Sequence, residues 1–185
     1  MRALLAPLIY AAAVSATYSA IAATNATSLY SNIGGKACTK HIDDKSTGAY
    51  TLNCPGVYGF RLHIMEDDQR SSVNVITPDN RSLPLDYWDT VTQGFSSLGN
   101  NAEWRIATVD GKAIPIAVIV RVIALDQTDP QHPKRVPLLA VAKIHRNAAC
   151  VTHIVSAATT GANEQARKFA DAEGMQCISV EPHTK

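Results

Sequence analysis

Six histidines are the first residues in this sequence whose chemistry could define a site. They are scattered, and no two are four residues apart, the spacing that places two imidazoles on one helical face. If Arg146 pairs with Cys150 on neighbouring strands, His153 lies opposite Lys143 and roughly 7 Å from His145. The lysine would repel a metal ion, and a solvated strand face explains the same residues. A weak copper or zinc site at His145 and His153 is therefore an alternative, and no cofactor is expected.

Carboxylate and serine chemistry leave weaker marks. The acidic segments 43–44 and 66–68 lack the alternating oxygens and the turn glycine of a calcium loop. Segment 94–99 resembles a nucleophile elbow only loosely, since its second glycine comes one place too late. The fold could still bring two carboxylates or a serine together without any mark in the sequence. A small periplasmic hydrolase with a polar cleft is thus a second alternative.

The four cysteines form two widely separated couples. Cys38, Cys54, Cys150 and Cys177 allow three pairings, and the shorter loops favour Cys38 with Cys54 and Cys150 with Cys177. Such bridges would stabilise the fold by about 3 and about 3.5 kcal/mol in the chain-entropy model. Neither couple has the close spacing of a zinc knuckle, so we predict two structural disulfides.

The first residues predict export. Arg2 precedes an uncharged, alanine-rich segment, and Ala20-Ile21-Ala22 offers the small residues that a signal peptidase recognises. We predict a cleavable signal peptide over 1–22 and a single disulfide-stapled domain over 23–185, periplasmic or secreted, with no membrane span after cleavage. The rival interpretation, a retained membrane anchor, requires a more hydrophobic segment.

The charge balance excludes one class of partner. The chain has 17 Lys and Arg against 16 Asp and Glu, and loss of Arg2 with the signal leaves equal numbers. A neutral domain has no general attraction for nucleic acid, so no nucleic-acid partner is expected.

Period-two alternation predicts that most of the domain is strand. Apolar residues alternate with polar ones over 58–65, and a turn at Pro78-Asp79-Asn80 separates the two arms of a hairpin, 72–77 and 81–85. A second hairpin turns at 109–111. A three-residue loop there places Trp104 opposite Ile116, whereas a two-residue turn would put Arg105 opposite Ile116, so we expect the longer loop.

Segment 114–124 is apolar on both faces except at Arg121, which predicts a central strand. A buried guanidinium alone would be very costly, so Arg121 is expected at the sheet rim, paired with a carboxylate such as Asp126 or Glu103.

The polar, proline-punctuated loop 125–135 follows that strand. Loops of this length on a rigid sheet often bind partners, although a solvated connection explains the same composition. The predicted contact residues, if the loop does bind, are Asp126, Asp129, His132, Lys134 and Arg135.

Two further strands, 137–146 and 150–156, precede a helix that begins at Thr160-Gly161 and stops at Gly174. A second helix is predicted over 87–98, where apolar residues recur at helical spacing. The fold class is therefore α+β: a mainly antiparallel, twisted sheet of about six strands with a C-terminal helix and a candidate second helix. The sequence leaves an open sheet and a closed barrel equally allowed.

Four segments, 29–38, 53–57, 103–105 and 119–122, resemble small exported proteins of alphaproteobacteria that are described as hypothetical. The resemblance implies a bacterial periplasm and supplies no functional residues. Export, two disulfides and the lack of a reaction motif together favour a non-enzymatic envelope protein, a protein-binding or inhibitor-type module whose partner is another envelope protein. The sequence does not specify an oligomeric state.

Overall fold

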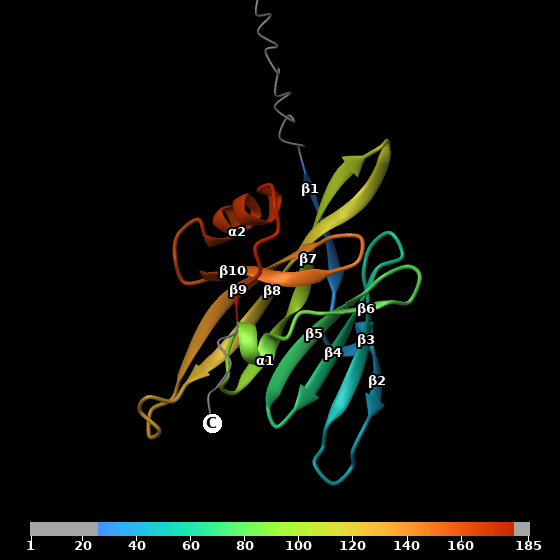
Figure 1. Cartoon of the computed structure of the whole chain (residues 1–185). Helices are drawn as coiled ribbons and strands as arrows, with labels where there is room; N and C mark the ends of the chain where they lie inside the picture. The colour runs from blue at the N-terminus through green and yellow to red at the C-terminus, as the bar shows by residue number, and fades with distance from the viewer. Residues whose placement is uncertain (1–25, 180–185) are drawn as a thin grey trace, which may run out of the picture.

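The computed structural model describes residues 26–179 and consists of two five-stranded antiparallel sheets packed face to face, with a helix on the outside (Figure 1). The predicted signal peptide lies outside the described residues. The long sheet has the order β1-β7-β8-β9-β10, and the short sheet runs from β2 to β6 in sequence order. The α+β class with antiparallel strands is confirmed, whereas the expected strand number is wrong: the described residues form ten strands in two sheets, and these do not form a barrel.

The elements have the following bounds: β1 Thr27–Asn32, η1 Gly35–Ala37, β2 Thr39–Ile42, β3 Tyr50–Pro55, β4 Arg61–Asp67, β5 Arg70–Ile76, β6 Ser82–Pro84, α1 Tyr87–Thr90, β7 Ser96–Val109, β8 Lys112–Asp126, β9 Lys134–Ile144, β10 Ala149–Ser156 and α2 Ala162–Asp171. Among residues 26–179, no helix combines the length and the apolar character that a bilayer crossing needs.

The long sheet is apolar on both faces because β8, its central strand, alternates between two hydrophobic cores. Val118 and Val120 belong to the core between the two sheets, together with the fully buried Trp104. Ala117 and Ile119 belong to the second core, beneath α2. The sequence correctly predicted a central strand here, since a strand buried on both faces reads as a continuous apolar run.

The short sheet supplies the other half of the inner core, largely from β4 and β5. The strand predicted over 58–65 begins only at Arg61, because Tyr58 and Gly59 have φ values of 51° and 81° and form a turn. The predicted hairpin at Pro78-Asp79-Asn80 is confirmed, with β5 and β6 as its arms.

The turn between β7 and β8 differs from the expected one. Asp110 and Gly111 both have positive φ, 50° and 72°, and Val109 pairs with Lys112, which is a two-residue turn. Further along the hairpin, Ile106 pairs with Pro115 and Arg105 with Ala117, so Ile116 is a bulge without a partner. This bulge shifts the register by one residue and places Trp104 opposite Val118. The prediction of a three-residue loop was wrong because it assumed that the β7–β8 pairing continues without a bulge.

Helix α2 packs on the outer face of the long sheet, over β8, β9 and β10 (Figure 1). Its buried residues are alanines at every fourth position, Ala162, Ala166 and Ala170, which confirms the predicted C-terminal helix. The second helix predicted over 87–98 is wrong beyond its first turn, because residues 96–98 instead pair with β8.

Both predicted disulfides are present, Cys38–Cys54 and Cys150–Cys177. They indicate an oxidising, extracytoplasmic environment. The second bridge holds the chain that follows α2 alongside β10, where the Ile178 amide donates a 2.8 Å hydrogen bond to the Val151 carbonyl.

We expect the two bridges to differ in their resistance to reduction. Cys177 is exposed, whereas Cys54 is only 2 % exposed and lies in the inner core. A thiol reductant must reach a sulfur atom, so Cys150–Cys177 should open at lower dithiothreitol concentration than Cys38–Cys54. Alkylation followed by mass spectrometry would measure this, and simultaneous opening in the folded protein would contradict it.

Candidate functional site

The predicted contact loop is shaped by its own carboxylates. Asp126 accepts a 3.0 Å hydrogen bond from the Thr128 amide, and this bond, with that from the Thr128 hydroxyl, holds the pKa of Asp126 below its ordinary value. Asp129 lies 3.0 Å from Nδ1 of His132. Asp126, Asp129 and His132 are therefore engaged within the loop and are less free to contact a partner.

The two basic residues at the end of the loop have different surroundings. Lys134 on β9 lies opposite Asp126 on β8, and its positive charge also lowers the pKa of Asp126. Arg135 lies opposite Leu125 and lines a groove on the protein surface, and its guanidinium forms no hydrogen bond or ion pair with any residue in 26–179. Of the five predicted contact residues, Arg135 is the one that faces a groove.

The two histidines of the predicted metal site lie far apart along the sheet. His153 is opposite Val141, and the His145 amide bonds to the Ala148 carbonyl in the β9–β10 turn, so four residues of β9, about 13 Å, separate them. The imidazole of His153 stacks on Phe169 with ring centroids 3.9 Å apart. Across residues 26–179, no group of three or more His, Cys, Asp or Glu side chains is placed to hold a metal ion. The metal site stays a prediction.

Where α2 meets the long sheet, two arginines are bound by carboxylates. Arg105 is 6 % exposed, and its Nε and Nη2 atoms donate hydrogen bonds of 2.8 and 2.7 Å to the Asp171 carboxylate. Glu103 accepts a 2.5 Å hydrogen bond from Nε of Arg167 and a 2.5 Å bond from the Ser28 hydroxyl. These bonds join α2 to β7 and β1.

The pKa of Glu103 reflects this enclosure. Burial raises the pKa of the carboxyl, but the hydrogen bonds from Arg167 and Ser28, with the charges of Arg167 and Arg105, outweigh burial. The net result is a pKa below the ordinary value, so Glu103 is ionised in the folded protein at neutral pH.

Arg121 differs from both of these arginines. It faces the same side of the long sheet and is half-buried, yet its guanidinium forms no hydrogen bond or ion pair with any described residue. The expected carboxylates are occupied elsewhere, Glu103 by Arg167 and Asp126 by the loop and Lys134. The predicted pairing of Arg121 with either acid is therefore absent from the described part of the chain.

The strand ladder is interrupted beside Arg121. Leu98 pairs with Val122 and Ala102 pairs with Val120, so residues 99–101 oppose Arg121 alone. A Cβ atom at Gly99 would lie 3.1 Å from the Arg121 Cβ, so the glycine gives the arginine stem room. Irregularities of this kind redirect side chains and occur often beside functional sites.

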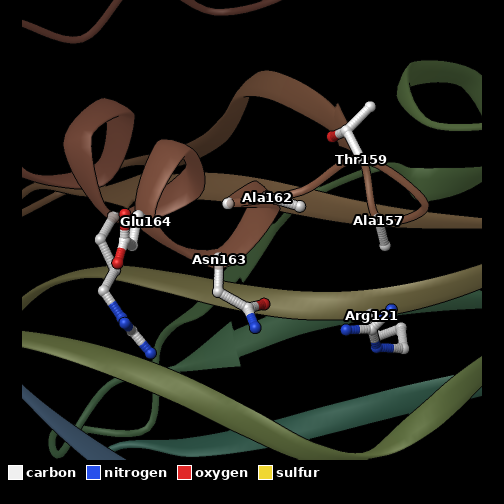
Figure 2. A pocket seen from close by; sticks show the side chains of 8 residues that line it. Arg121, Ala157, Thr159, Ala162, Asn163 and Glu164 are labelled. Atoms are coloured by element: carbon white, nitrogen blue, oxygen red, sulfur yellow. The ribbon is translucent and has the colours of Figure 1, made fainter.

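A groove of about 310 Å³ lies between Arg121 and the start of α2. Figure 2 shows the Asn163 side chain pointing from the helix toward the sheet, with the Arg121 guanidinium to one side of it. Thr159, Glu164 and Arg167 complete the polar lining, so the groove contains one carboxylate beside its two guanidinium groups. We call this the Arg121 groove. Its donors could bind a carboxylate or another anion.

A second groove, of about 290 Å³, continues along the same sheet toward the loop. Its apolar lining comes from Phe95, Ile123, Ala124 and Leu125. Its polar lining comes from Glu66, Gln69, Ser96, Ser97 and Arg135. Burial raises the pKa of Glu66, although the hydrogen bond from Ser71 opposes that effect.

Arg121 lines the first groove, and Ile123 and Leu125 line the second; these three residues alternate along β8 and share its outer side. On β9 they are opposite Leu139, Pro137 and Arg135 respectively. We call the part of this surface that α2 does not cover the open face; it consists of the half-buried Arg121, Ile123, Leu125 and Pro137 and the exposed Arg135. Its apolar centre lies between two unpaired arginines.

A serine and a carboxylate also meet close to the second groove. The Ser71 hydroxyl donates hydrogen bonds of 2.7 and 2.8 Å to the two Glu66 oxygens, but Ser71 is 1 % exposed and does not line either groove. Ser96 and Ser97, from the segment that resembles a nucleophile elbow, line the second groove together with Glu66. Ser96 is 8 % exposed, and its Oγ accepts a hydrogen bond from the Ser71 amide. In this arrangement the hydroxyls hold the two sheets together, and the hydrolase alternative stays a prediction.

Comparison with known proteins finds no family model, no curated protein and no solved structure that matches this chain. The sequence reasoning singled out Arg121 but missed the groove, because Asn163 and Thr159 reach it only through the packing of α2. The one available signal was a lone guanidinium within an apolar strand.

We expect the removal of an arginine to change the free energy of unfolding very differently at two sites. Arg105→Leu leaves Asp171 without its partner beneath α2 and should lower the free energy of unfolding by about 3 kcal/mol. Arg121→Leu breaks no ion pair among the described residues and extends the apolar open face, so stability should change by less than about 0.5 kcal/mol or rise. Urea unfolding of both variants gives the comparison, and a large loss in Arg121→Leu would show that Arg121 is structurally paired.

The Glu103 ion pairs should also weaken at acid pH. A carboxyl with a lowered pKa in the folded state stabilises the fold above its unfolded pKa, near 4.5, and this contribution disappears as the pH falls through the folded pKa. The stability difference between the wild type and Glu103→Gln should therefore shrink below about pH 4.5. Thermal unfolding from pH 7 to pH 3 measures the difference, and a constant value would contradict the assignment.

Proposed function

We propose that this protein is a non-enzymatic binding module of the cell envelope, and that its open face binds an acidic, extended segment of another envelope protein. Arg121 is the observation on which the proposal depends. A half-buried guanidinium without a carboxylate costs free energy in the unbound protein, and a bound carboxylate would remove that cost.

The charges of the open face define the partner. Arg135 lies level with Leu125, four residues from Arg121 along β8, which corresponds to about 13 Å. An extended peptide places residues i and i+4 at the same separation and on the same side. A segment with acidic residues four apart and an apolar residue midway would bring both carboxylates to arginines and its apolar side chain to Ile123 and Pro137.

The size of the grooves agrees with a peptide segment as ligand. Volumes near 300 Å³ are at the lower limit for small-molecule pockets, but they are sufficient for individual side chains. Export to the periplasm or the exterior is part of the proposal, and the two disulfides support an oxidising compartment.

A labelled peptide with the core Glu-Ser-Leu-Ser-Glu tests this proposal by fluorescence anisotropy at low salt. Arg121→Gln should weaken binding by about tenfold or more, because a charge-assisted hydrogen bond is lost, and Arg135→Gln should act similarly. The matched control is Arg146→Gln, which removes one exposed charge in the β9–β10 turn.

Two further peptides separate charge from shape. Replacing both Glu by Gln should abolish binding, and replacing Leu by Gly should weaken it. Equal binding of the wild type and Arg121→Gln would overturn the proposal, as would equal binding of all three peptides. Peptide and ester hydrolysis assays on the same samples test the hydrolase alternative directly.

A further inference from the structure

The two sheets have four edge strands, and three of them are protected against pairing with another chain. An unprotected edge presents unpaired backbone groups that accept an additional strand. The edge of β10 is covered by the segment after α2, through the Cys150–Cys177 bridge and the hydrogen bond from Ile178 to Val151.

The edges of the short sheet are protected by length and by charge. Strand β6 has only three residues, including Pro84, and the neighbouring Arg81 donates hydrogen bonds to the Arg146 carbonyl and the Asn147 side chain across the gap to the long sheet. Strand β2 has four residues, two of which are Lys40 and His41. Short strands, prolines and charged side chains all discourage edge pairing.

The fourth edge, β1, has none of these features. Its six residues include no charged side chain, no proline and no glycine, and it pairs with β7 without a register shift. Leu29 and Tyr30, its two large apolar residues, are 39 % and 58 % exposed. The strand is therefore flat, uncharged and partly apolar.

Contacts behind the edge hold β1 in place. The Ser28 hydroxyl donates to Glu103, the Ser31 hydroxyl accepts a 2.9 Å hydrogen bond from Nε1 of Trp104, and the Tyr30 hydroxyl accepts one of 3.1 Å from Arg167. An edge that is already ordered loses little conformational entropy when a second strand binds.

We propose that β1 pairs antiparallel with β1 of a second copy of this chain, joining two long sheets into one ten-stranded sheet. A twofold axis perpendicular to the sheet satisfies both edges at once, and it brings either Leu29 against Leu29 or Tyr30 against Tyr30. Because β1 is uncharged, two copies approach without repulsion between like charges.

The short length of β1 limits the affinity of the dimer, and the direction of the twofold axis determines how the two copies are oriented. Six-residue strands bury less than the ~1,600 Å² of a standard interface, so the dissociation constant should lie in the micromolar range. The same axis leaves both outer faces on one side of the joined sheet. Two open faces would then point the same way, and a partner with two acidic segments would bind with avidity.

Sedimentation velocity of the exported, processed protein tests the dimer between about 1 and 200 µM. The wild type should shift from monomer to dimer over this range. Leu29→Lys places like charges beside the axis and should leave a monomer. Ile154→Lys is the matched control, since Ile154 is 38 % exposed on β10, whose edge is covered, and this variant should dimerise like the wild type.

Mixing Leu29→Lys with Leu29→Glu should restore the dimer, which separates lost pairing from lost folding. Hydrogen exchange of the wild type needs no variant: the β1 amides should become more protected at high concentration, whereas the β10 amides should not. A monomer at 200 µM, or a dimer that Leu29→Lys does not disrupt, would overturn the proposal.

Discussion

The two apolar faces of the long sheet are the constraint on which the rest of the structure depends. The short sheet covers the inner face, and Trp104 fills the centre of that interface. Within residues 26–179 the outer face is covered by α2, a helix of ten residues whose buried side chains are alanines. A helix of this length covers part of the face, and the remainder, with Ile123 and Pro137, stays accessible. The position of the open face therefore follows from the length and placement of one helix.

The arginines on this face differ in whether a carboxylate lies close enough to bind them. Glu103, on β7, binds Arg167 of α2, and Asp171, the last residue of α2, binds Arg105 of β7. The contacts that dock the helix on the sheet therefore also compensate these charges. Arg121 lies beyond the helix, where no described carboxylate reaches it. The same packing that neutralises two guanidinium groups leaves the third facing a groove, and this contrast distinguishes a structural arginine from a candidate binding residue.

The predictions that succeeded concern features with a local physical cause. The central strand at β8, the hairpin of β5 and β6, and the helix α2 are each specified by the period of apolar residues within a few positions. The predicted disulfide couples are correct because short loops close more easily than long ones. The strands β1, β2 and β3 were missed because their short, polar sequences show little alternation, and their pairing with neighbouring strands stabilises them instead.

The predictions that failed concern competition between segments. Residues 96–98 have helical spacing, yet pairing with β8 satisfies their backbone within the sheet. In the β7–β8 hairpin, a bulge at Ile116 allowed a two-residue turn while keeping Trp104 in the core. A bulge of this kind cannot be recognised from the alternation of either strand alone, since it depends on how the two strands fit together.

The sequence by itself determined which segments alternate, which cysteines couple and that one arginine interrupts the central strand. These are properties of residues that are close together along the chain, and their physical causes act over a few positions. Only the tertiary structure decided which carboxylate each arginine binds, because Glu103 and Arg167 are 64 residues apart and meet only when α2 docks on the long sheet. The exposed part of Arg121 is a consequence of that docking, since the position of the helix determines which charges are enclosed and which remain free to bind a partner.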